Sequence, residues 1–63
     1  MPSPTRNFYL RALRAFEDRS ARTSDTVDAC ETLMLAFETI GYPDWWQDVT
    51  RLRSDAELRE LYG

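Results

Sequence analysis

Apolar residues recur at intervals of three and four along most of the chain, and this spacing predicts helices rather than strands. The first helix is expected from about residue 6 to residue 22. Pro2 and Pro4 precede it in a short extended lead, and Thr5 is placed to cap its first turn. The predicted inward stripe consists of Tyr9, Ala12, Leu13, Phe16 and Ser20. The opposite side is polar and rich in arginine.

A second helix is expected over residues 26–40. Thr23, Ser24 and Asp25 supply capping side chains before it, and Gly41 ends it. Its apolar face covers about half of the circumference, which suits the central helix of a small bundle. That face consists of Thr26, Ala29, Cys30, Leu33, Met34, Ala36, Phe37 and Ile40.

Two further helices are predicted after the turn at residues 41–43. One covers about residues 44–53, and a short last helix covers about residues 55–62. Ser54 and Glu57 match a capping box, in which the two side chains satisfy each other's free backbone N–H groups, so a break is expected there. The third helix places Trp45, Val49 and Leu52 on one stripe, and the last helix turns Leu58, Leu61 and Tyr62 inward.

These elements predict an all-α fold, a compact bundle of three main helices plus a short C-terminal helix. The 63 residues form one helical domain, residues 1–63, whose core is small for its surface. The sequence does not determine the helix-packing angles, because a bundle and an orthogonal arrangement fit the pattern equally. Self-association or a partner is one way to support so small a core, so a homo-oligomer is a possible state.

Neither a membrane span nor a secretory signal is visible in the sequence. The single cysteine, Cys30, lies on the apolar face of the second helix. It is expected to be a small buried hydrophobic residue, with a reactive thiol as the alternative. We therefore expect a cytoplasmic protein that does not associate with membranes.

Charge is distributed unevenly along the chain. Residues 1–22 hold five arginines against two acids, which gives +3, and residues 23–63 hold three arginines against nine acids, which gives −6. Most of these charges lie in helix termini, where the helix dipole favours acids first and cations last. All basic residues are arginine, which suggests a GC-rich bacterial or phage genome.

Catalytic chemistry has little to draw on in this sequence. It contains no histidine, no lysine, no phosphate-binding glycine loop and no cysteine cluster for zinc. Asp44 and Asp48 lie one turn apart, but a hard cation needs more oxygen ligands than these two carboxylates supply. We expect no enzyme activity, no cofactor and no metal, and therefore a function in binding.

Nucleic-acid binding is the alternative function that the arginines raise. Guanidinium groups on one helix face neutralise backbone phosphates, and the candidates are Arg6, Arg11, Arg14 and Arg22. Asp18 interrupts this face and is placed to pair with Arg14 or Arg22. The acidic remainder of the chain would repel phosphates. A helix-turn-helix is disfavoured too, because Asp44 and Asp48 lie at the start of the would-be recognition helix.

Several apolar residues miss the inward stripes and indicate a protein-binding surface. Leu35 falls on the polar side of its helix between acids, and Leu10 and Trp46 lie off the stripes of theirs. Apolar anchors ringed by charge are typical of protein interfaces. The predicted binding residues are Leu10, Glu31, Met34, Leu35, Glu38, Tyr42 and Trp46. The sequence thus predicts a small non-catalytic regulator, inhibitor or accessory subunit that binds another protein through an acidic, apolar-studded surface. Spacing along the chain does not decide whether these residues form one patch.

Overall fold

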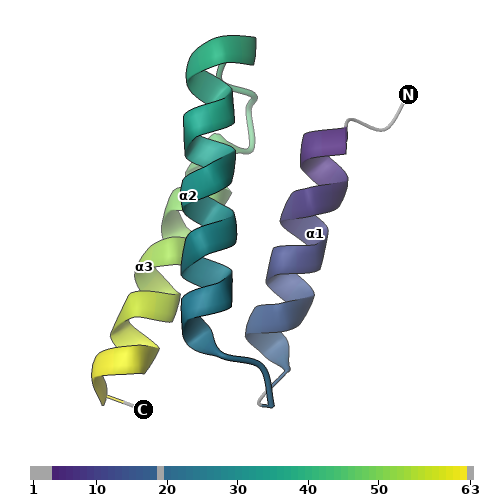
Figure 1. The fold of residues 1–63 in the computed structure, drawn as a ribbon. Helices are drawn as coiled ribbons and strands as arrows, with labels where there is room; N and C mark the ends of the chain where they lie inside the picture. The colour runs from purple at the N-terminus through teal and green to yellow at the C-terminus, as the bar shows by residue number, and fades with distance from the viewer. Residues whose placement is uncertain (1–3, 19, 63) are drawn as a thin grey trace.

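The computed structural model describes residues 4–18 and 20–62, which form three helices and no strand (Figure 1). They are α1 (Pro4–Glu17), α2 (Thr23–Ile40) and α3 (Trp46–Tyr62). The chain runs down α1, up α2 and down α3, so consecutive helices are antiparallel. The predicted all-α class is confirmed, but with three helices instead of four. Pro2, Arg19 and the side chain of Thr5 lie outside the described part.

A shared core joins the three helices. Its buried members are Tyr9 and Ala12 from α1, Cys30, Leu33 and Phe37 from α2, and Val49 and Leu52 from α3. Leu13, Phe16, Ala29, Met34 and Trp45 pack around them. The three predicted inward stripes are therefore confirmed in their central residues. Burying each large side chain of this kind contributes about 1.5–3 kcal/mol.

An aromatic cluster packs against this core next to the turn that precedes α3. Trp45 lies between Tyr9 of α1 and Phe37 of α2, with ring centroids 5.5 Å and 5.2 Å apart, and meets Phe37 edge to face. Offset and edge-to-face pairs add about 0.5–1.5 kcal/mol each beyond their buried area. Trp45 itself belongs to the turn that precedes α3, and this turn therefore helps to hold α1 against α2.

The first helix differs from its prediction at both ends. Pro4 lies inside the first turn, where a missing N–H costs nothing, so the extended lead predicted for Pro4 is wrong. The helix ends at Glu17, five residues before the expected Arg22. Asp18 Oδ1 accepts hydrogen bonds from the backbone N–H of Ser20 at 2.9 Å and from its hydroxyl at 2.7 Å. This local turn competes with helix and ends it.

The second helix begins earlier than expected and ends where predicted. Thr23 opens it, three residues ahead of Thr26, so Thr23 and Asp25 lie in the first turn rather than capping it from outside. Gly41, with φ of 100°, ends the helix and donates its N–H to the Phe37 carbonyl at 2.9 Å. This φ favours glycine. Ile40 lies in the last turn and is exposed, which corrects its expected burial.

The third helix is continuous through residues 54–57, so the predicted capping box and the fourth helix are wrong. It also begins at Trp46 instead of Asp44, because Pro43 to Trp46 form a turn closed by a 3.0 Å hydrogen bond. The inward stripe simply continues to Ala56, which is fully buried, and this packing outweighs the local capping signal.

Continuity of α3 also changes the orientation of its last residues. At 100° per residue, an unbroken helix carries its C-terminal apolar side chains away from the stripe that ends in Ala56. The residues predicted to point inward, Leu58, Leu61 and Tyr62, are accordingly 52%, 76% and 85% exposed. In the described part of the chain, no helix has the length and apolar character needed to cross a membrane.

Candidate functional site

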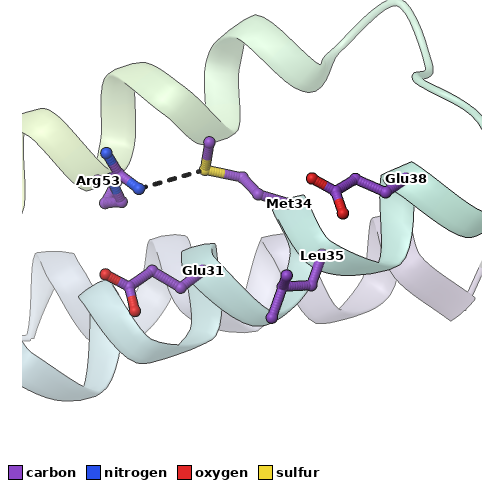
Figure 2. A pocket seen from close by; sticks show the side chains of 5 residues that line it. All are labelled: Glu31, Met34, Leu35, Glu38 and Arg53. Carbon is purple, nitrogen blue, oxygen red and sulfur yellow. Dashed lines mark hydrogen bonds between the residues drawn. The ribbon is translucent and has the colours of Figure 1, made fainter.

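Four of the predicted binding residues line one depression between α2 and α3. These residues are Glu31, Met34, Leu35 and Glu38, and Arg53 of α3 completes the wall (Figure 2). We call this depression, of about 310 Å³, the α2 groove. Sequence reasoning missed Arg53, because this residue follows Met34 by 19 positions. Only the packing of α3 on α2 brings the two side chains together.

Helical spacing explains how the α2 groove is formed. Glu31, Leu35 and Glu38 recur at intervals of four and three, so they share one side of α2. Leu35 lies between the two carboxylates and is 66% exposed. Met34 extends from α2 toward α3, where its sulfur accepts a weak hydrogen bond from Arg53 Nη1 at 3.8 Å (Figure 2). The floor is thus apolar and the α2 side is acidic.

Arg53 is held in place from its own helix. Its Nε lies 3.3 Å from Glu57 Oε1, one helical turn away, an ion pair without hydrogen-bond geometry. The structure shows no other ion pair within the described part of the chain. The carboxylates of Glu31 and Glu38 therefore have no ion-pair partner among those residues, and both residues are exposed.

Tyr42 and Trp46 form an exposed aromatic pair at the turn between α2 and α3. Their ring centroids are 5.6 Å apart at an interplanar angle of 75°, and Tyr42 also packs against Phe37 with centroids 6.1 Å apart. Trp46 precedes Arg53 by seven residues, or about two turns, and so lies on the same side of α3. The aromatic pair therefore adds apolar surface to the side of α3 that carries Arg53, at the N-terminal end of α3.

Leu10 does not lie with these residues, and the sequence pattern left open whether it would. It lines a separate depression of about 250 Å³ with Asn7, Arg11 and Arg14, all on α1. We call this the α1 outer face. The sequence indicated that Leu10 misses the inward stripe, but not which other surface it would share.

The four arginines of the nucleic-acid alternative are likewise divided. Arg11 and Arg14 lie together on the α1 outer face. Arg6 instead lies over the rings of Tyr9 and Trp45, with its guanidinium carbon 5.1 Å and 5.2 Å from their centroids. Arg22 stands at the N-terminus of α2. The structure therefore brings two of the four together, and one of the others is held by aromatic rings.

Asp18 does not form the ion pair that its spacing from Arg14 and Arg22 predicted. Its carboxylate binds Ser20 instead, and these hydrogen bonds from the hydroxyl and the backbone N–H lower the pKa of Asp18. Arg14 is consequently left without an acidic partner within the described part of the chain. The cationic character of the α1 outer face is stronger than the sequence pattern indicated.

Cys30 is fully buried in the core, as predicted for a small hydrophobic residue. Burial raises the pKa of its thiol to about 11, so the nucleophilic thiolate is scarce at neutral pH. This contradicts the alternative of a reactive thiol. Among the described residues, no group of three or more acidic, cysteine or histidine side chains is arranged to hold a metal ion.

Comparison of the chain with protein-family models, with curated proteins and with solved structures found no match. The α2 groove and the α1 outer face are therefore interpreted from their own chemistry.

Proposed function

We propose that the chain is a small, non-catalytic regulator, inhibitor or accessory subunit that binds another protein through the α2 groove. One observation carries this proposal. Four residues that the sequence predicts for protein binding line a single depression, namely Glu31, Met34, Leu35 and Glu38. Exposed apolar anchors with charge around them are how interfaces concentrate binding energy. The exposed pair of Tyr42 and Trp46 supplies further anchor surface.

The chemistry of the α2 groove supports a partner of complementary chemistry. Glu31 and Glu38 lie seven residues apart, which corresponds to about 10.5 Å along the helix axis, and Leu35 lies between them. A complementary surface has an apolar side chain with cationic groups on both sides of it. We propose the cytoplasm as the location, because an unpaired buried cysteine fits a reducing compartment.

Affinity capture from native cells followed by reconstitution tests this function. Proteins that co-purify with the wild type, but not with Leu35→Asp, are identified, purified and titrated by calorimetry against both forms. We expect 1:1 binding that weakens at least about tenfold for Leu35→Asp and for Trp46→Ala. Leu61→Asp is the matched control, because Leu61 is exposed outside the α2 groove.

Binding that the three variants weaken equally, or no protein whose binding depends on Leu35, would overturn the proposal. The nucleic-acid alternative is tested in parallel with a random DNA duplex. Tight binding at low salt that collapses as salt rises, and that is lost in Arg11→Gln/Arg14→Gln, would favour that alternative. We expect negligible binding, because the net charge of −3 repels phosphates.

A further inference from the structure

The α1 outer face and the α2 groove have complementary chemistry. The first presents Leu10, 43% exposed, beside the cations Arg11 and Arg14. The second presents Leu35 between two anions. Each surface has an exposed leucine beside charges that form no ion pair within the described residues, and the two sets have opposite sign. Arg53, the one cation in the lining of the α2 groove, is itself paired with Glu57. Complementary potentials of this kind orient two proteins on encounter and fix their register.

We propose that the α1 outer face of one copy docks in the α2 groove of a second copy, with the two helices antiparallel. Placing Leu10 against Leu35 sets the register of the contact. Arg14 follows Leu10 by four residues and Glu31 precedes Leu35 by four residues, so an antiparallel pairing puts this cation opposite this anion.

The same register matches the remaining residues of both surfaces. Asn7 precedes Leu10 by three residues and falls opposite Glu38, to which its side-chain amide can donate. Arg11 falls opposite Met34, where its aliphatic stem covers the apolar floor. Its guanidinium then points to solvent and away from Arg53, whose Nη1 lies 3.8 Å from the Met34 sulfur. Asn7, Leu10 and Arg14 therefore meet residues of compatible chemistry, and Arg11 contributes through its stem alone.

Association by this contact runs head to tail. The α2 groove lies between α2 and α3, whereas all residues lining the α1 outer face belong to α1, on the other flank of α2 (Figure 1). A copy that docks through α1 therefore keeps its own α2 groove free for the next copy. Such heterologous contacts add copies in a chain or close into a ring, unlike a two-fold dimer.

Sedimentation of the purified protein alone tests this contact, from micromolar to near-millimolar concentration. We expect the average mass of the wild type to rise with concentration, and to rise less at high salt because surface charges are screened. Leu10→Asp and Leu35→Asp each remove one side of the contact and are expected to lower the association constant at least about tenfold. Both residues are exposed, so folding is retained, which circular dichroism verifies.

Mixing the two variants distinguishes a head-to-tail contact from other self-association. Leu35→Asp keeps a functional α1 outer face, and Leu10→Asp keeps a functional α2 groove. The mixture is therefore expected to form a 1:1 dimer at concentrations where each variant alone is still largely monomeric. The matched control Leu61→Asp is expected to associate like the wild type, since Leu61 lies on neither surface.

A wild type that stays monomeric throughout overturns the proposal. So does a mixture that associates no more strongly than the separate variants, or a variant that alone associates as strongly as the wild type. The result is separate from that for the proposed function, because no other protein is present. Trp46→Ala also separates them. It removes an anchor proposed for the foreign partner but no residue of the self-contact, so it is expected to leave self-association intact.

Discussion

The guanidinium of Arg59 in α3 lies over the ring of Phe16 in α1, with its central carbon 3.7 Å from the ring centroid. The same guanidinium donates a hydrogen bond through Nη1 to the Phe16 carbonyl. That carbonyl belongs to the last turn of α1, whose final carbonyls lack partners within the helix. Arg59 therefore stabilises the end of α1 and joins the two outer helices.

Replacing Arg59 by alanine is expected to destabilise the fold by about 1 kcal/mol, from loss of the cation–π contact and of the charge-assisted hydrogen bond. In a domain of this size this corresponds to a decrease in Tm of about 4–8 °C. Thermal unfolding followed by circular dichroism measures it. Arg51→Ala, on an exposed part of the same helix, is the control and is expected to change Tm little. Equal effects of both variants would contradict the role of Arg59.

Ser54→Ala tests the continuity of α3 directly. Ser54 is exposed inside the helix, so alanine is expected to raise the free energy of unfolding by a few tenths of a kcal/mol, through its higher helix propensity. A helix start at this position would give the opposite sign, a loss of about 1 kcal/mol on removal of the capping hydroxyl. Urea unfolding of both proteins decides between the two signs.

Thr26→Val is expected to stabilise the protein by about 1 kcal/mol. The Thr26 hydroxyl is buried in α2 and has no hydrogen-bond partner among the residues that the structure describes. This carries a desolvation cost that a methyl group of similar shape removes. Thr32→Val is the matched control, because the exposed Thr32 hydroxyl bonds the Asp28 carbonyl at 2.9 Å. Urea unfolding measures both variants. A gain for Thr32→Val as large as that for Thr26→Val would reject this explanation.

The raised pKa of Cys30 predicts a loss of stability in alkali. The thiol of the unfolded chain ionises near its ordinary pKa of 9.0, whereas the folded chain holds the proton up to about 11. Between these values the unfolded state binds fewer protons, so the free energy of unfolding falls as pH rises. Tyr9, whose pKa is also raised, chiefly by burial, adds a loss of the same sign.

Urea unfolding at about pH 8 and about pH 10.5 measures this dependence. The wild type is expected to lose more stability between the two conditions than Cys30→Ala, which has no thiol to ionise. An equal loss in both proteins would show that the thiol does not contribute. Alkylation at the lower pH supplies a second measurement, since Cys30 is expected to react slowly until urea unfolds the chain.

Helix existence and the core were predictable because they depend on spacing along the chain. Tyr9 and Ala12 on α1 and Leu33 and Phe37 on α2 repeat at helical intervals, and a glycine ended α2 as expected. The end of α1 and the continuity of α3 were not predictable. At the end of α1 a local turn competes with the helix, and in α3 a local capping signal competes with core packing. Burial of Ala56 decided the second case, and burial depends on tertiary packing rather than on local sequence.

The candidate site was predictable only within one helix. Leu35 lies one helical turn after Glu31, so the side of α2 that they share could be inferred from the sequence. The contribution of Arg53 required knowledge of how α3 packs on α2. Separation of Leu10 from the α2 groove required the position of α1, which no spacing within a single helix encodes.

Arg59 and Phe16 lie 43 positions apart along the chain. In contrast, a short connection joins α2 to each of the two helices that pack against it. In kinetic terms, helical proteins with mostly local contacts fold within about microseconds to milliseconds. A contact that closes so long a loop is expected to form late, so its loss should accelerate unfolding and leave the folding rate nearly unchanged. We therefore expect the C-terminal ends of α1 and α3 to be joined last on folding and released first when the native state opens.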